Sequence, residues 1–114
     1  MVEESDGGGL MELFFKLIVG HAIADFALQS DFVAFNKGRT SKIPGMWPYV
    51  LASHSLFHGF FVMYFTGSWK LGLAEAVVHA MIDFAKCEQK ISLHVDQALH
   101  VLCKVLWVAL AVTL

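Results

Sequence analysis

The stretch HAIADFA, residues 21–27, returns in nearly the same form as HAMIDFA, residues 79–85, and this repeat decides how the chain folds. Five of the seven positions are identical, including a histidine at the first position and an aspartate at the fifth. Residues four apart lie on one face of an α-helix, one turn above another. The repeat therefore predicts two helices, each with a His–Asp pair on a single face.

The sequence around the repeat is apolar. Of its 114 residues, 57% are hydrophobic and 16% are charged, and its mean hydropathy is +0.62. Soluble domains have about a quarter of their residues charged, and a soluble chain this short buries too little surface to hide so many apolar side chains. The apolar residues form four stretches of about twenty residues, enough to cross a hydrocarbon core, at 10–29, 46–66, 69–86 and 93–114. We predict an all-α integral membrane antiparallel four-helix bundle made of two similar helical hairpins, after a flexible polar tail at residues 1–9.

Basic residues indicate an orientation. Lys37, Arg39 and Lys42 lie in the first connection, and Lys86 and Lys90 lie at the third. The positive-inside rule places both connections, residues 30–45 and 87–92, in the cytoplasm and both termini outside. The net charge of −2 gives no reason to expect nucleic acid as a partner. Two cysteines at different depths indicate neither a disulfide nor a thiolate metal site.

Each predicted helix carries one polar pair at i,i+4 spacing, although an aspartate at the centre of a membrane helix costs about 2.5–3.5 kcal/mol. In the predicted bundle all four pairs fall in the cytoplasmic half, so that eight side chains converge on one layer. These are His21 with Asp25, His54 with His58, His79 with Asp83, and Asp96 with His100.

A metal centre is the preferred interpretation of this layer, because helical bundles hold metals with inward carboxylates and imidazoles. The eight residues are the predicted ligands, and their nitrogen and oxygen atoms suit one or two divalent ions of zinc, iron or manganese. Two divalent ions, three carboxylates and one bridging hydroxide sum to zero charge, which a low-dielectric site favours. The alternative is interhelical hydrogen bonding, at about 0.6–2 kcal/mol per contact.

A second polar layer is predicted deeper in the bundle. Glu75 lies one turn before His79, and Lys104 lies one turn after His100. Because their helices are antiparallel, Glu75 and Lys104 should form a structural ion pair near the membrane middle, where an unpaired charge is untenable. Alternatively, Lys104 holds an anionic group of a substrate.

The runs HAIADFALQSDFVAFNKG, HAMIDFAK and DQALHVL, with a helix of paired histidines between the first two, resemble a family of small phage and bacterial membrane proteins, the domain of unknown function 3307. The resemblance covers the chain after its glycine-rich start. It implies a multi-pass protein of the bacterial, or phage-infected, inner membrane. The His/Asp pattern is also similar to that of inner-membrane metal-dependent hydrolases.

The leading functional hypothesis is a metal-dependent, di-metal membrane hydrolase. It would act on a lipid head group or a small phosphate compound at the cytoplasmic face, with Asp25 or Asp96 as general base. An oxygen-activating di-iron enzyme is the redox variant. Two alternatives stay open: a transporter or channel for a metal ion or proton, and a small accessory protein that binds a membrane partner or a second copy, with the polar layer as structural support. Haem is disfavoured, because it needs two axial ligands and space rather than three carboxylates.

Overall fold

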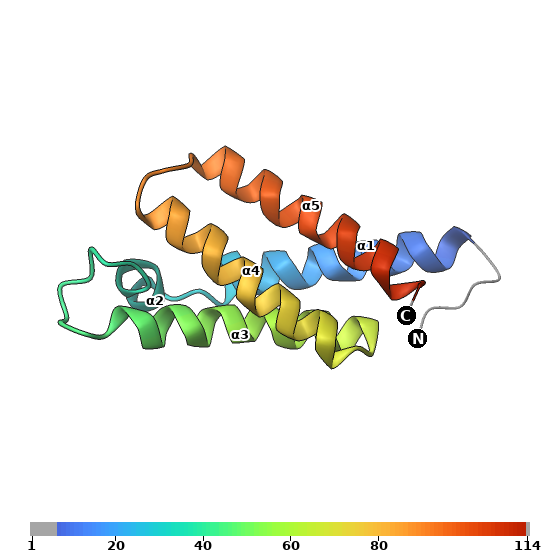
Figure 1. Ribbon diagram of the computed structural model, residues 1–114, viewed down its shortest axis with the longest axis horizontal. Coiled ribbons are helices and arrows are strands. Elements are labelled where there is room, and N and C mark those ends of the chain that lie inside the picture. The colour runs from blue at the N-terminus through green and yellow to red at the C-terminus, as the bar shows by residue number, and fades with distance from the viewer. Residues whose placement is uncertain (1–6, 114) are drawn as a thin grey trace.

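The computed structural model describes residues 7–113, and its regular structure is helical (Figure 1). The elements are α1 (Gly7–Ala22), a π-helical turn (Ile23–Ala27), α2 (Asp31–Asn36), α3 (Trp47–Thr66), α4 (Trp69–Cys87) and α5 (Leu93–Ala111). Within residues 7–113 there is no strand. The predicted all-α class is confirmed.

Short capping signals set where the helices begin and end. Ser30, Ser68 and Ser92 precede α2, α4 and α5, and each hydroxyl accepts the backbone N–H three residues on, at 3.1–3.2 Å. Such a cap stabilises a helix by about 1 kcal/mol. Gly67 ends α3 with a φ of 73°, a left-handed conformation that glycine adopts without strain. The α3–α4 turn is therefore tight, and the two helices form a hairpin.

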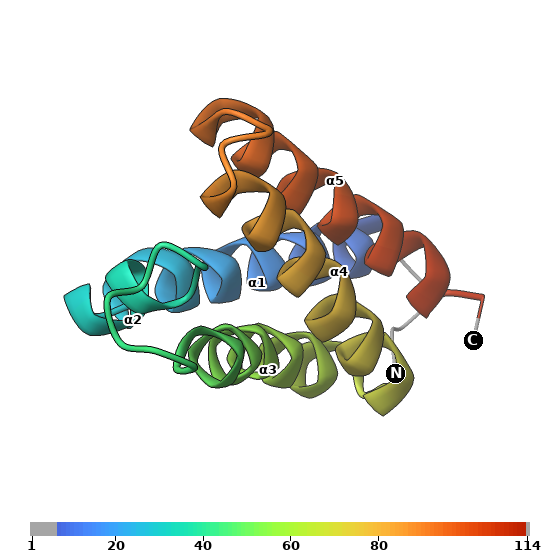
Figure 2. The same ribbon diagram turned by 60° about the vertical axis from the view of Figure 1, so that its left-hand side comes forward.

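The long helices form an antiparallel bundle in which α1 and α4 each pack against α3 and α5. The α3–α4 contact is the closest, because glycines face each other there: a Cβ on Gly59 would lie 2.6 Å from the Gly72 carbonyl oxygen. In Figures 1 and 2, α2 and the α4–α5 connection lie at the opposite end of the bundle from the α3–α4 turn. This topology brings the polar ends of the four helices together.

The first predicted helix differs from the observed one. It was predicted over residues 10–29, but α1 begins at Gly7, ends at Ala22 and continues as the π-helical turn, in which Leu28 donates its backbone N–H to the Ile23 carbonyl at 2.8 Å. Because this turn is wider than an α-helical one, the side chains after His21 point in other directions around the helix axis than in a regular α-helix. Single π-helical turns are frequent at functional sites.

The connection predicted as a loop over residues 30–45 also differs, because it contains α2, which begins after the Ser30 cap. Of the predicted tail, residues 1–6 lie outside the described residues.

Polar side chains fill one half of the bundle interior and apolar side chains fill the other. The apolar half consists of Leu13, Leu17, Val62, Leu71, Trp107 and Ala111. The polar half includes four carboxylates, five histidines and two lysines, each at most 6% exposed: Asp25, Glu75, Asp83, Asp96, His21, His54, His58, His79, His100, Lys37 and Lys104. Six charged residues, four acidic and two basic, are thus buried inside the bundle.

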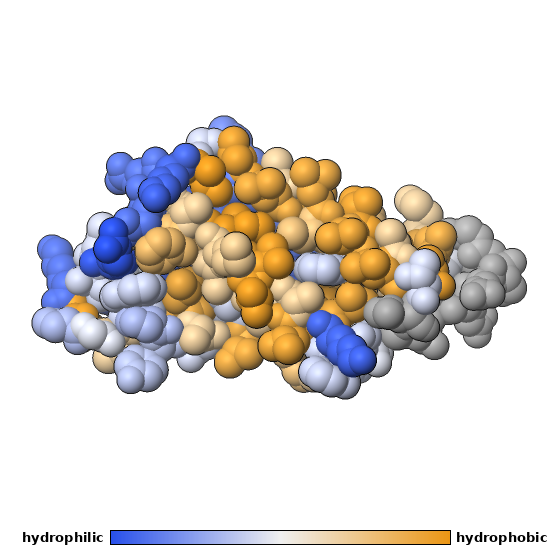
Figure 3. Space-filling view, viewed as in Figure 1, coloured by the Kyte–Doolittle hydropathy of each residue, from blue (hydrophilic) through white to orange (hydrophobic). Residues whose placement is uncertain are grey.

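The outer surface is correspondingly apolar. Phe15, Met81 and Leu102 are among many large hydrophobic residues that are more than 60% exposed, and Figure 3 shows an apolar band along the bundle with hydrophilic residues toward its ends. By length and composition, one described helix, α5, is apolar enough to cross a membrane, where the sequence predicted four. The reason is that α1 has only 16 residues before its π-helical turn, while buried polar side chains lower the hydropathy of α3 and α4.

Candidate metal centre

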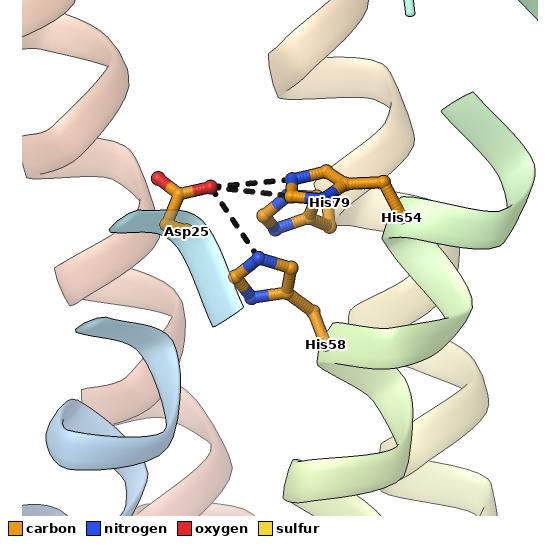
Figure 4. Close-up of side chains that lie close together, drawn as sticks. All are labelled: Asp25, His54, His58 and His79. Atoms are coloured by element: carbon orange, nitrogen blue, oxygen red, sulfur yellow. Dashed lines mark hydrogen bonds and ion pairs between the residues drawn. The ribbon is translucent and has the colours of Figure 1, made fainter. Parts of the chain in front are cut away.

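Four side chains from three helical segments converge at the centre of the polar half (Figure 4). Asp25 comes from the π-helical turn, His54 and His58 from successive turns of α3, and His79 from the middle of α4. All four are buried, with at most 6% of each residue exposed. We call them the Asp25 group.

The separations within the Asp25 group approach those of ligands around one ion. The Oδ1 atom of Asp25 lies 3.3 Å from the Nε2 of His54, 3.4 Å from that of His58 and 4.0 Å from that of His79. One ligand atom from each residue lies within 4.8 Å of the others. Tetrahedral zinc, with bonds of about 2.0–2.2 Å, requires separations of roughly 3.3–3.6 Å. The three imidazoles and one carboxylate need only a small contraction to meet this geometry.

Two ring nitrogens without a hydrogen bond also fit a cation, and carboxylate oxygens lie 3.3–3.4 Å from them. The Nε2 atoms of His58 and His79 are buried and have no hydrogen-bond partner. The other ring nitrogen of His79, Nδ1, lies 3.2 Å from an oxygen of Glu75. If Nδ1 carries the proton and donates to Glu75, the Nε2 lone pair points into the Asp25 group, as in the carboxylate–histidine–metal arrangement of many proteins.

Glu75 is anchored by two further donors. Lys104 Nζ lies 2.8 Å and Trp107 Nε1 2.7 Å from its Oε1 atom, so the structure contains the ion pair that the sequence suggested. Glu75, His79 and His100 also lie close enough to share an ion. Since three donors already use the Glu75 carboxylate, we interpret it as support for His79. Trp107 was missed in the sequence, because a tryptophan in an apolar run gives no polar signal.

A second set of ligand atoms lies beside the first. Asp83, Asp96 and His100 form it, and the His100 Nε2 is 3.4 Å from Asp83 Oδ1 and 3.4 Å from Asp96 Oδ1. The other oxygen of Asp83, Oδ2, faces the first set and lies 3.3 Å from the Nε2 of His79. Asp83 thus belongs to the second set through Oδ1 and faces the Asp25 group through Oδ2.

The eighth predicted ligand, His21, lies in the layer but in neither set. Its ring centroid is 5.1 Å from that of His100 and 5.3 Å from that of His58. Its Nε2 lies 3.0 Å from the side-chain oxygen of Gln97, and the Gln97 amide donates to Asp25 Oδ2 at 2.9 Å and to Asp96 Oδ2 at 3.0 Å. Gln97 thus links both carboxylates. It stands in the run DQALH, residues 96–100, but the i,i+4 criterion does not select it.

Lys37 is the residue whose position the sequence did not reveal. It was assigned to a cytoplasmic loop, yet it is only 6% exposed, and its Nζ donates to Asp83 Oδ2 at 2.9 Å. The residues after Lys37 hold this segment on α4. The Arg39 guanidinium hydrogen-bonds Glu88, which lowers the pKa of the Glu88 carboxyl group. The same guanidinium lies 5.8 Å from the centroid of the Phe84 ring.

Comparison with known proteins gives a family but no relative of known function. No curated protein and no solved structure matches the chain. Residues 13–114, which include every residue of both ligand sets, match the family described as "Protein of unknown function (DUF3307)". The chain belongs to the DUF3307 family.

Proposed function

We propose that this protein is a membrane-embedded metal-binding protein that hydrolyses phosphate esters at the cytoplasmic face of a bacterial inner membrane. The observation that carries the proposal is the convergence of Asp25 Oδ1 and three imidazole nitrogens, with all four ligand atoms within 4.8 Å of one another in a buried site. The ligands suit zinc, iron or manganese.

The reversed distribution of polarity supports a membrane location. Large exposed apolar patches are rare on soluble monomers, whereas this chain exposes apolar residues along the bundle and buries charges (Figure 3). The three helices α3, α4 and α5 have 20, 19 and 19 residues. At 1.5 Å per residue they are about 28–30 Å long, close to the thickness of a hydrocarbon core. All four long segments then span the bilayer, with residues 30–45 and 87–92 in the cytoplasm and both termini outside.

Asp96 is suited to act as the general base. It is 3% exposed, its Oδ1 atom makes no hydrogen bond although His100 Nε2 lies 3.4 Å away, and its Oδ2 atom is held by Gln97. Asp25, the other candidate from the sequence, is surrounded by imidazoles and is better placed as a ligand. An ion held by the Asp25 group would act as a Lewis acid on the phosphate oxygens, and Asp96 would take a proton from the water that attacks phosphorus. The bond from phosphorus to the ester oxygen breaks, and the leaving alkoxide takes the proton from Asp96, so one water is consumed.

A conduction pathway is less consistent with the interior. Beyond the Glu75–Lys104 pair, the bundle is filled by apolar side chains such as Leu17, Val62 and Trp107. An ion or proton leaving the centre toward the outer face would have to cross this region without polar partners. Hydrolysis needs access from the cytoplasmic end alone.

The hydrolase proposal predicts phosphate release that depends on Asp96. The protein, purified in detergent and loaded with zinc, manganese or iron, is assayed with phosphatidic acid in mixed micelles and with a water-soluble phosphomonoester. The Asp96→Asn variant should retain its ion and lose activity by about 10²–10⁴-fold, the usual contribution of a general base.

The two substrates distinguish a lipid head group from a free phosphate compound. Asp31→Asn, which makes the same chemical change at an exposed position on α2, serves as the control and should retain wild-type rates. Metal-loaded wild-type protein that releases phosphate from neither substrate would refute the hydrolase, as would full activity in Asp96→Asn.

A further inference from the structure

Lys37 places a buried ammonium group against the two sets of candidate ligands. Its Nζ is 2.9 Å from Asp83 Oδ2, the oxygen that also lies 3.3 Å from His79 Nε2 and 3.5 Å from His54 Nε2. In a two-ion centre Asp83 would be shared, because its Oδ2 lies near His79 and His54 of the first set and its Oδ1 near His100 of the second. The Lys37 ammonium already uses the oxygen that faces the first set.

The packing around Lys37 shows that its position is built into the fold. Gly38 is buried, and a Cβ there would lie 2.8 Å from the Cβ of Cys87 at the end of α4. The next residue, Arg39, hydrogen-bonds Glu88, which directly follows Cys87. Lys37 also follows α2 directly, and its backbone N–H donates to Val33 at 3.0 Å. Contacts on both sides therefore direct the lysine inward.

The charge of the cluster then determines how many ions it can bind. Glu75 is balanced by Lys104, which leaves the carboxylates of Asp25, Asp83 and Asp96 with three negative charges. Lys37 supplies one positive charge, so with neutral imidazoles the centre carries two negative charges. One divalent ion neutralises it, whereas two ions would leave an excess of two positive charges, or of one with a bridging hydroxide, in a low-dielectric interior.

We propose that Lys37 acts as the second cation of this centre, so that the protein binds one divalent ion rather than two. The inference rests on the proposed metal-binding function and changes its stoichiometry. Two divalent ions, three carboxylates and one hydroxide sum to zero charge only when the Lys37 ammonium is left out. Removing that charge should therefore open the Asp83–Asp96–His100 set to a second ion.

The test measures ions bound per chain in detergent-purified protein at saturating Zn²⁺ and, separately, Mn²⁺, by equilibrium dialysis and elemental analysis. Wild-type protein should bind one ion. Lys37→Gln should bind two, and Lys37→Arg, which keeps the charge, should bind one. Lys42→Gln makes the same change at an exposed lysine of the same connection and should bind one.

The outcomes separate this inference from the proposed function. Two ions in the wild-type protein, or one ion in folded Lys37→Gln, would overturn the role of Lys37 and leave metal binding intact. No ion in the wild-type protein would overturn both. The wild-type measurement decides the stoichiometry even if Lys37→Gln does not fold.

Discussion

Replacement of Asp25 by asparagine is expected to weaken the binding of a divalent ion by more than about 100-fold. Changes to residues that merely support a ligand cost about 10–100-fold in metal affinity, and Asp25 is the one carboxylate of its group. Its Oδ1 atom is the point shared by the Nε2 atoms of His54, His58 and His79, at 3.3–4.0 Å. Asparagine preserves the size of the side chain and removes the charge that attracts the ion.

This loss is measured by competition against a chromophoric chelator in detergent solution. Asp31→Asn is the matched control, because Asp31 is an exposed aspartate outside both ligand sets, and it should retain wild-type affinity. Folded Asp25→Asn protein that binds the ion as tightly as the wild type would exclude Asp25 as a ligand.

Lys104→Met is expected to reduce the free energy of unfolding by about 3–5 kcal/mol, the cost of removing one partner from a buried ion pair. Lys104 and Glu75 are each 1% exposed, and the Nζ–Oε1 distance is 2.8 Å. Without Lys104, the Glu75 carboxylate remains buried with only Trp107 and His79 beside it. A buried carboxylate with too few partners destabilises the folded state.

A second substitution tests this cause. In the double variant Glu75→Gln/Lys104→Met no charge is left unpaired, so much of the lost stability should return. Thermal unfolding in detergent measures both variants. Lys16→Met, which breaks the exposed Glu12–Lys16 pair at 3.4 Å, should cost less than about 1 kcal/mol. A Lys104→Met variant as stable as Lys16→Met would contradict the proposed role of the buried pair.

Helical periodicity accounts for what the sequence could predict. The i,i+4 pairs of α3, α4 and α5 lie on helices that end within one or two residues of the predicted bounds, apart from the end of α5 at Ala111. Because a regular helix fixes which residues share a face, seven of the eight suggested ligands fall into the two sets that the structure brings together. The eighth, His21, lies beside them and contacts Gln97.

The features that the sequence did not reveal depend on contacts between distant segments. Lys37 turns inward because Gly38 packs on Cys87 and Arg39 binds Glu88, about fifty residues away in the chain. A basic residue in a polar connection otherwise resembles any solvated lysine. Gln97 contacts His21 of α1, Asp25 of the π-helical turn and Asp96 of α5, and a spacing rule within one helix does not detect it. The π-helical turn at Ile23–Ala27 has no composition signal either.

The most direct test of the central claim is the metal content of wild-type protein purified in detergent, before and after dialysis against a weak chelator, with the coordination read by X-ray absorption. The account predicts one zinc, iron or manganese ion per chain, with nitrogen and oxygen ligands at about 2.0–2.2 Å and no sulfur. Folded protein that carries no ion and takes up none from a saturating solution would contradict it, and would leave the buried histidines and aspartates as structural contacts between helices.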